Sequence, residues 1–400
     1  MKRLGKRTII FDSPPCVIGN AAVVGKTEGE GPLCKEFDFI HEDDMLGEKS
    51  FEKAESALQK DAVMRALQRA GKLPDDIDLI LAGDLLNQNS ASNFALRELG
   101  IPLLGLFGAC STMALTLGLA AILVEAGAGS LAVATTSSHF CSAERQFRMP
   151  LEYGGQRPQS AQRTVTGAGA SVVAPHNGEF PAIHAVTFGK IVDLGIKDAN
   201  NMGAAMAPAA AETIAAYFTD TNSNADSFDY IITGDLGYVG SELLNELLIK
   251  DYNLDISSKH TDCGKMIFDK EKQDTHAGGS GCGCSASVLN SYFINRLKTG
   301  EIKNILFIAT GALMSPTTSL QGESIPSIAH LVNIRKPDSV NRGEKMAKIL
   351  NDLKIISISA NIIRILSIIR TVLTVGIIAF SVMKTLSLFK DSDNRIETAY

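Results

Sequence analysis

The sequence has 400 residues, 45% of them hydrophobic and 20% charged, which is the balance of an ordinary globular chain with a large core. A net charge of −6, spread without acidic blocks, argues against nucleic acid as a partner. Seven cysteines in a chain that starts without an apolar signal-like run lead us to expect a reducing compartment rather than a disulfide-stapled secreted domain.

In chain order, strands and helices alternate, which is typical of the α/β class. A first strand is expected over Thr8–Phe11, followed by a turn at Pro14-Pro15 and a glycine-rich loop that runs through Gly31. The 3.6-residue period of apolar positions predicts a helix over Phe51–Gly71. The next expected elements are an all-apolar strand over Ile77–Ala82, a short helix over Asn93–Leu99, and, further on, a strand over Ser130–Thr135.

One stretch between these elements carries a candidate nucleophile. Residues 104–114 read as a short apolar strand, a tight turn through Gly108, and a helix that begins near Cys110 and runs to about Ala126. At a helix N-terminus, free N–H groups and the macrodipole favour the thiolate form of a cysteine. The alternative is a small side chain packed under the turn, because free cysteines are among the most buried residues.

The second half of the sequence repeats the first. Three segments recur in the same order and with nearly the same spacing: 77–85 as 228–236, 109–112 as 283–286, and 131–135 as 305–310. A repeat of three segments in one order indicates an internal duplication, with halves at residues 1–178 and 179–334.

Nine short motifs along the chain carry a family resemblance. They are GDLLNQN (83–89), FGACSTM (107–113), ATTSSHF (134–140), AERQFRMPLEYGGQRP (143–158), MGAAMAPAAAETI (202–214), TGDLGYVGSELL (233–244), KHTDCG (259–264), GGSGCGCSAS (278–287) and ATGALMSP (309–316). In this order, from near residue 1 to about Asn333, they resemble the stage V sporulation protein AD family. The resemblance implies a thiolase-like, duplicated five-layer α/β/α/β/α fold in which the two cysteine-bearing helices meet at the centre.

The same resemblance implies a function in sporulation. It implies a non-catalytic subunit that binds dipicolinic acid, with or without calcium, within the membrane machinery that moves dipicolinic acid in and out of the spore. The implied partners are the other spore membrane transport subunits and a second copy of the chain, and the implied location is the core-facing side of the spore inner membrane.

The expected site lacks two groups that acyl transfer needs. In this fold the nucleophile works with two histidines, or with a histidine and an asparagine, that form an oxyanion hole and relay protons. Where similar ketoacyl synthases carry these groups, this sequence has Gly234-Asp235 and Cys282-Gly283. An ionised aspartate cannot donate to an oxyanion and a thiol donates poorly, so we expect no turnover unless His260 or His276 takes over.

A pocket for dipicolinate needs cations or N–H groups around a flat slot. The start of the Cys110 helix offers N–H groups, and Arg145, Arg148 and Arg157 are candidates for a bidentate carboxylate contact or for surface contacts. We also predict ligand-binding roles for four further residues, Asp84, His139, Asp235 and Cys282. A structural role for His139 and loop-fixing roles for the two aspartates are the alternatives.

Neither a cofactor nor a protein-bound metal ion is expected. Cys282-Gly283-Cys284 is too tight for a zinc site, and Gly278-Gly279-Ser280-Gly281 lacks the spacing of a phosphate-binding loop. We interpret the glycine run as a turn where the two halves approach closely.

The last part of the chain differs in composition. Residues 335–354 read as a polar linker, and residues 355–400 as a hydrophobic tail whose apolar part, 355–389, contains only basic charges. Ile365–Met383 is nearly long enough to span a bilayer, but Arg370 lies inside it. We expect a membrane-associated helix; an interfacial helix, a partner helix and a segment foreign to the family are the alternatives.

Two rival functions remain open at this point. One is a β-ketoacyl synthase or thiolase-type acyltransferase that uses Cys110. The other is a scaffold that binds only proteins and has no small-molecule ligand.

Overall fold

The computed structural model describes residues 1–147, 157–337, 381 and 383, and the chain divides into two units. The first unit, Met1–Asp338, holds all the elements discussed below. Of the second unit, Ser339–Tyr400, only Ser381 and Met383 are described, so the expected hydrophobic tail and most of the linker lie outside the described residues. Within the described residues, no helix combines the length and the apolar character that crossing a membrane requires.

The first half of this unit follows the expected alternation of strands and helices. Its elements are β1 (Lys2–Leu4), β2 (Thr8–Ile10), β3 (Cys16–Val24), α1 (Lys26–Gly29), β4 (Phe39–Ile40), α2 (Phe51–Ala70), β5 (Leu79–Gly83), α3 (Ser90–Leu96), β6 (Leu103–Gly105), α4 (Thr112–Glu125), β7 (Ala132–Ser138), α5 (Phe140–Phe147), β8 (Arg163–Thr164) and β9 (Gly167–Ala174).

The second half contains a comparable series. Its elements are β10 (Ala182–Phe188), α6 (Met202–Thr221), β11 (Tyr230–Thr233), α7 (Gly237–Tyr252), β12 (His260–Asp262), α8 (Cys263–Met266), β13 (Gly279–Ser280), α9 (Cys282–Val288), a π-helical turn (Leu289–Phe293), α10 (Ile294–Thr299), β14 (Asn304–Ala312), α11 (Pro316–Leu320) and β15 (Ser327–Arg335).

The main strands of the two halves are arranged in the same way. The order is β6-β5-β7-β9-β3 in the first half and β12-β11-β14-β15-β10 in the second. If the five strands of each half are numbered along the chain, both orders read third, second, fourth, fifth, first. In both, the fifth strand runs antiparallel to its two neighbours and the other pairs are parallel. The duplication predicted from the sequence is therefore present in the topology.

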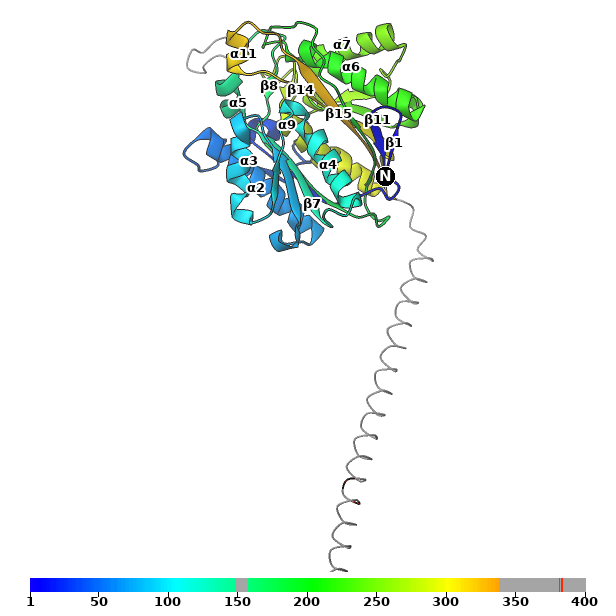
Figure 1. The fold of residues 1–400 in the computed structure, drawn as a ribbon. Coiled ribbons are helices and arrows are strands. Elements are labelled where there is room, and N and C mark those ends of the chain that lie inside the picture. Colours follow the sequence, from blue (N-terminus) through cyan, green and yellow to red (C-terminus); the bar gives the residue numbers. More distant parts are fainter. Residues whose placement is uncertain (148–156, 338–380, 382, 384–400) are drawn as a thin grey trace, which may run out of the picture. The chain divides into compact units, whose positions relative to one another are not determined.

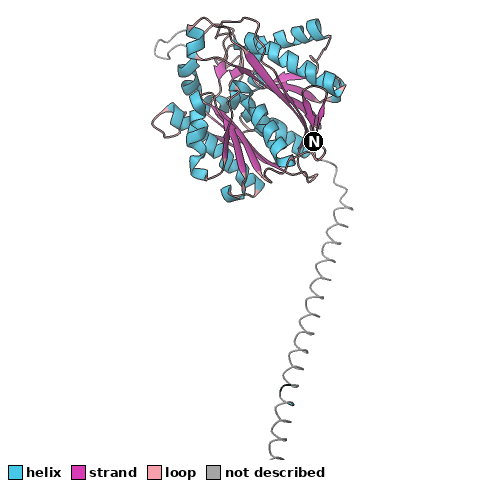
Figure 2. Ribbon diagram, viewed as in Figure 1, coloured by secondary structure: helices cyan, strands magenta, loops and turns pink. Residues whose placement is uncertain are grey.

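Helices cover both sheets and fill the space between them (Figures 1 and 2). On one side α2 packs on β3, β7 and β9, and on the other α6 packs on β10, β14 and β15 with α7 against it. Between the sheets, α4 contacts strands of both halves and α9 packs beside it. The order helix, sheet, helix, sheet, helix confirms the five-layer fold, and the central position of α4 explains why its side chains are apolar nearly all round.

The two sheets are joined by few backbone pairs and by a buried polar network. Only the pair Cys16–Ala182 connects β3 to β10. The side chain of Asn20 on β3 donates from Nδ2 to the carbonyl of Asn290 (2.5 Å) and accepts from Lys298 Nζ (2.5 Å), so it bonds to the α9–α10 segment of the second half. Asn20 is fully buried, and these contacts hold the two halves together.

The region between Pro14 and Gly31 corrects a sequence expectation. Instead of a glycine-rich loop after the two prolines, the structure has the nine-residue strand β3, which pairs with β9 along its length. Its Gly19 lies against α2, where an added Cβ would be 2.4 Å from the carbonyl oxygen of Ala66. The glycine marks a close helix–strand contact rather than a loop.

Candidate functional site

Cys110 lies in the tight turn between β6 and α4. A 3₁₀ turn over Ala109–Ser111 precedes α4, and Ala109 has a φ of +49°, a conformation that residues with a Cβ rarely adopt. Two hydroxyl groups hold this turn: Ser111 Oγ donates to the Gly108 carbonyl (2.6 Å) and Thr112 Oγ1 donates to the Ala109 carbonyl (2.6 Å). The turn therefore fixes the position of the Cys110 side chain without help from a ligand.

The surroundings of Cys110 keep its thiol protonated. The side chain is buried, and burial raises the pKa of the thiol well above its ordinary value, with the neighbouring Asp235 and Cys282 adding to the shift. The thiol donates a hydrogen bond to the carboxyl group of Asp235. This finding differs from the thiolate expected at a helix N-terminus, because α4 begins only at Thr112 and an acidic group faces the sulfur.

Asp235 lies two residues after the end of β11 and is fully buried. Its carboxylate oxygens accept hydrogen bonds from the Gly281 N–H (2.9 Å) and from Thr310 Oγ1 (2.8 Å), in addition to the bond from Cys110. Burial raises the pKa of Asp235 to about 7 although these three donors lower it. Near neutral pH this carboxyl group is thus partly protonated.

Cys282 completes the group from the second half of the chain. It is the first residue of α9, is fully buried, and packs with Leu85, Cys110 and Ala143. Its Sγ donates to the carbonyl of Ser137 (2.9 Å), and burial raises its pKa well above the ordinary value. The structure thus brings together Cys110, Asp235 and Cys282, all three named from the sequence.

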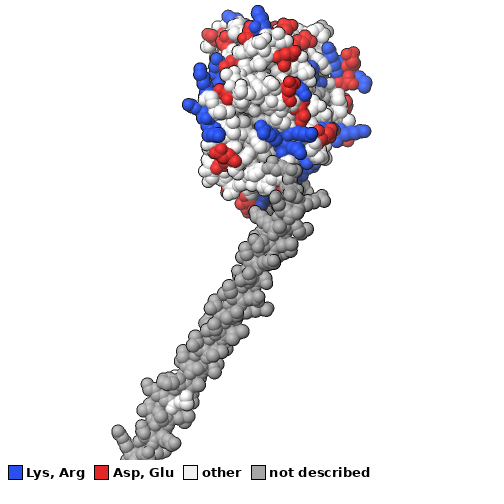
Figure 3. All heavy atoms as spheres, turned by 90° about the vertical axis from the view of Figure 1, so that its right-hand side faces the viewer, with Lys and Arg blue, Asp and Glu red and all other residues white. Residues whose placement is uncertain are grey.

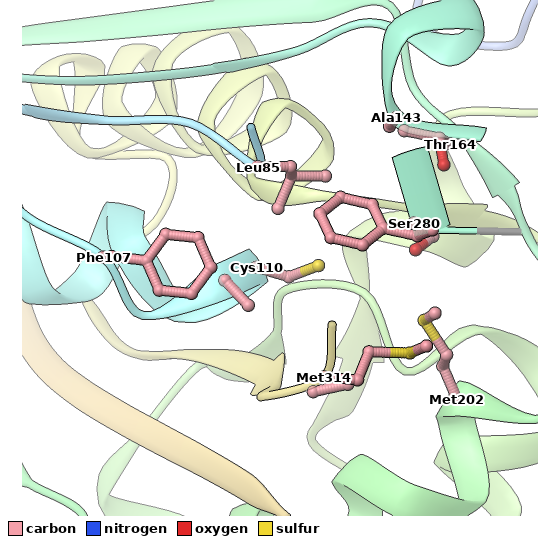
Figure 4. A pocket seen from close by; sticks show the side chains of 11 residues that line it. Leu85, Phe107, Cys110, Ala143, Thr164, Met202, Ser280 and Met314 are labelled. Atoms are coloured by element: carbon pink, nitrogen blue, oxygen red, sulfur yellow. The ribbon is translucent and has the colours of Figure 1, made fainter. Parts of the chain in front are cut away.

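A small, mostly apolar cavity of about 30 Å³ lies beside Cys110 (Figure 4). Its polar lining residues are Cys110, Thr164 and Ser280, and its apolar lining residues are Leu85, Phe107, Ala109, Ala143, Phe147, Met202, Ala312 and Met314. A cavity of this volume holds roughly two water molecules. A ring-sized ligand must therefore displace side chains, and the two methionines are suited to this because their thioether chains adapt easily.

Asp84 lies behind the wall of this cavity rather than in its lining. Its carboxylate accepts from the Leu86 N–H (2.8 Å), the Ser92 N–H (2.8 Å) and Ser92 Oγ (2.7 Å). The loop that it fixes carries Leu85, which does line the cavity. The arrangement corresponds to the loop-fixing alternative for this residue.

A further buried carboxylate, Glu55 on α2, was missed by the sequence analysis. Its oxygens accept from Ser137 Oγ (3.2 Å) and Ser142 Oγ (2.6 Å), and burial followed by the charge of Asp84 raises its pKa to about 8. The available signal was its position next to Ala54 on the buried face of α2. A charged residue is rare on such a buried face unless it has partners. Here the Glu55 hydrogen bonds connect α2 to β7 and α5.

His139 is buried outside the cavity lining, and both of its ring nitrogens are engaged. Nε2 bonds to the carbonyl of Asp44 (2.7 Å), and Nδ1 accepts from the Cys141 N–H (3.2 Å). A nitrogen that accepts carries no proton, so the ring is neutral, and burial lowers its pKa. The ring also lies 5.4 Å from that of Phe51, which gives His139 a packing role.

The arginine candidates do not reach the cavity within the described residues. On α5, Ala143 and Phe147 share the face that lines the cavity, whereas Arg145 points elsewhere and pairs with Glu52. Arg157 donates to the carbonyls of Asp274 (2.7 Å) and Gln162 (3.5 Å). Arg148 lies outside the described residues.

The two histidines considered as substitutes for a missing base also lie outside the lining. His260 bonds to Thr233 Oγ1 (2.9 Å), and burial lowers its pKa to about 4. His276 bonds to the Pro158 carbonyl (3.0 Å) and to Asp274 (2.8 Å). In the described part of the chain no group of three or more histidine, cysteine or acidic side chains is arranged to hold a metal ion.

Other lining residues were not named from the sequence. Met202, Ser280 and Met314 lie within the quoted motifs, but nothing in those strings distinguishes a residue that lines a cavity from its neighbours. Phe107 and Phe147 also lie within these motifs without a distinguishing signal, and Thr164 lies outside them.

Comparisons with known proteins point to one family and one fold. A family described as "Stage V sporulation protein AD (SpoVAD)" matches residues 5–335. The Stage V sporulation protein AD of Bacillus subtilis (strain 168) is 48% identical over 330 residues, which cover 82% of this chain and 97% of that protein.

Among solved structures, the cerulenin-bound OleA of Xanthomonas campestris has a TM-score of 0.52 at 15% identity, covering 82% of this chain and 98% of that chain. The 3-oxoacyl-(acyl carrier protein) synthase III, FabH, of Xanthomonas oryzae pv. oryzae has a TM-score of 0.50 at 13% identity, covering 82% and 100%. At these identities the likeness concerns the fold alone, and it agrees with the thiolase-like architecture described above.

Proposed function

The chain belongs to the stage V sporulation protein AD family, and from this membership we propose that it is a non-catalytic sporulation protein whose Cys110 cavity binds dipicolinic acid. The observation that carries the proposal is the hydrogen bond from the Cys110 thiol to the buried Asp235. It favours the thiol form at the position where a nucleophile would have to be a thiolate.

The environment of Cys110 supports a binding role over acyl transfer. An oxyanion hole needs donors aimed at the developing charge, and here the groups beside the sulfur are a carboxyl and a second thiol, Asp235 and Cys282. The Cys282 thiol already donates its hydrogen bond to the Ser137 carbonyl. A β-ketoacyl synthase or thiolase reaction at Cys110 is therefore the less favoured alternative.

The charge of the ligand favours dipicolinate bound together with calcium. Among the described residues, the lining of the cavity contains no lysine, arginine or histidine. A free dianion beside Asp235 would be repelled whenever that carboxyl is ionised, whereas a 1:1 chelate with Ca²⁺ carries no net charge. Binding without calcium is the alternative, and it requires a cation from another part of the protein.

We further propose that the chain forms a homodimer through the edge strand β6. This strand ends the first half-sheet, so its outer backbone groups are unpaired within the described sheet. Leu104 on the strand is 41% exposed, and Phe107 and Phe94 beside it are 49% and 60% exposed. A second copy paired along β6 would cover these side chains, and Phe107 also lines the cavity.

The remaining partners follow from the family. We propose that the protein works with other spore membrane transport subunits at the core-facing side of the spore inner membrane, to which the segment 355–389 attaches it. Nucleic acid is not among the proposed partners: on the face shown in Figure 3, basic and acidic side chains are interspersed and no basic stripe is visible.

Calorimetry of the full-length chain with dipicolinate, with and without Ca²⁺, tests the proposal. We expect saturable 1:1 binding that is tighter with calcium. No heat under either condition, with the protein folded, would favour a scaffold that binds only other proteins. Iodoacetamide labelling followed by an acyl-CoA chase tests the enzymatic alternative, which requires an acyl group on Cys110 that turns over at about 1 per second or faster.

A further inference from the structure

The glycine run before α9 has room for one side chain only. An added Cβ on Gly279 would lie 2.8 Å from Ile267 Cγ2, and one on Gly281 would lie 2.7 Å from Ser138 Oγ. Gly278 and Gly281 also have φ values of +101° and +102°, which side chains disfavour. The backbone of β13 is thus packed so closely that only Ser280 carries a side chain, and that side chain faces the cavity.

Ser280 is only 3% exposed and its hydroxyl forms no hydrogen bond to another described residue, but its oxygen is open to the cavity rather than enclosed by protein. β13 pairs with β8 so that Ser280 lies opposite Thr164, and both side chains project to the same face of the ladder, as Figure 4 shows. Thr164 Oγ1 donates to Glu144 (3.2 Å), and the Cys110 thiol donates to Asp235. Of the three polar lining residues, only Ser280 keeps its proton available.

A hydroxyl that opens into a small, mostly apolar cavity without a protein partner can give its hydrogen bond only to a molecule in that cavity. Alanine at this position would fill the same space without offering a donor. We propose that Ser280 is the binding residue that donates a hydrogen bond to a carboxylate oxygen of the ligand in the Cys110 cavity. This inference rests on the proposed function, since it assigns a contact within the same site.

The proposal predicts how dipicolinate binding changes when the hydroxyl oxygen of Ser280 is removed or replaced by sulfur. In the full-length chain, Ser280→Ala should weaken dipicolinate binding by about tenfold or more, the range for a hydrogen bond to a charged group. Ser280→Cys keeps a side chain of similar size with a weaker donor, and should bind with intermediate affinity. Ser291→Ala is the matched control, because Ser291 is also buried but donates to the Ser287 carbonyl (2.7 Å) and does not line the cavity.

Calorimetry and thermal melting of all four proteins separate the outcomes. If wild type binds and Ser280→Ala alone loses affinity at an unchanged melting temperature, the contact is supported. If wild type binds and Ser280→Ala binds as well or more tightly, water alone satisfies the hydroxyl and this inference is wrong, while the proposed function stands. If the folded wild type does not bind dipicolinate, the proposed function itself fails. Should Ser280→Ala unfold, Ser280→Cys decides by the same comparison.

Discussion

The thiol of Cys110 and the carboxyl group of Asp235, which come from opposite halves of the chain, share one hydrogen bond beside the cavity. The carboxylate opposes ionisation of the thiol, because two negative charges at hydrogen-bond distance in a buried site are costly, whereas the neutral thiol, as a donor, favours the ionised form of Asp235. The Cys110 thiol therefore stays protonated and forms a polar part of the cavity lining. This pairing makes the reactivity of Cys110 depend on a residue that does not itself line the cavity.

Asp235→Asn should make Cys110 more reactive. The substitution removes the negative charge that raises the pKa of the thiol, while burial, the larger cause, remains. We expect alkylation of Cys110 by iodoacetamide at pH 8 to become several-fold faster, as followed by mass spectrometry of the labelled peptide. Cys16, whose thiol is also buried but contacts the Pro175 carbonyl, serves as the internal control. An equal rise at both cysteines would instead indicate general loosening of the fold.

Cys110→Trp should weaken dipicolinate binding by more than tenfold, which corresponds to more than about 1.4 kcal/mol. The cavity is already small, and an indole at this position fills the space that a planar ring would take. The affinity is measured by calorimetry, with a melting curve to confirm folding. Unchanged affinity in the folded variant would place the ligand elsewhere.

Glu55 should make the protein less stable as the pH rises. Its pKa in the folded state is about 8, above the ordinary 4.5, so between these values the folded chain holds a proton that the unfolded chain has released. The stabilising contribution is full below about pH 4.5 and is lost as the pH approaches 8. Glu55→Gln should flatten this decline in the free energy of unfolding, measured by urea titration at pH 5.5 and pH 8. The half-exposed Glu52→Gln is the control, and equal slopes for wild type and Glu55→Gln would contradict the prediction.

Leu104→Lys should convert a dimer to a monomer. A lysine in the middle of β6 places a charge where a second copy would bury leucine, and edge strands that stay unpaired commonly carry such charges. Sedimentation velocity gives the oligomeric state. Leu73→Lys, at a 70% exposed position away from β6, should leave it unchanged. If wild type sediments as a monomer, the proposed interface does not exist.

Removal of residues 339–400 should release the protein from liposomes of anionic lipid. The segment 355–389 is apolar and carries only positive charges, which suits an acidic membrane surface. The last described strand of the first unit, β15, ends at Arg335, before the removed residues, so the melting temperature and the affinity for dipicolinate should stay the same. A truncated protein that melts many degrees lower would show that the tail belongs to the fold.

The sequence predicted the helices and parallel strands well because their apolar patterns follow from burial. The predicted helix over Phe51–Gly71 is found as Phe51–Ala70, ended by Gly71 with a φ of +65°. β3 was missed because its glycine and asparagine suggest a loop. Both residues occur in this strand because of contacts far away in the sequence: Gly19 allows the close contact with α2, and Asn20 bonds to Asn290.

The site was predicted only in part, for the same reason. Cys110, Asp235 and Cys282 were named because the duplication and the family motifs place them at matching strand and helix ends. Ser280 and Glu55 act through neighbours far away in the chain, so nothing near them in the sequence marks their roles. The protonation of Cys110 likewise depends on which side chain faces it, and this is known only once the halves are packed together.

The bonds from Asn20 to Asn290 and Lys298 have a mechanical consequence. Asn20 and Asn290 are buried and Lys298 is partly buried. Moving the two halves apart would separate these groups from their partners, at a cost of a few kcal/mol for each buried group left unpaired. Access to the interior must instead come from rotation of individual side chains around a rigid frame. A small molecule would then enter and leave the interior through motions of single side chains and loops. These motions take nanoseconds to microseconds, which is faster than domain movement.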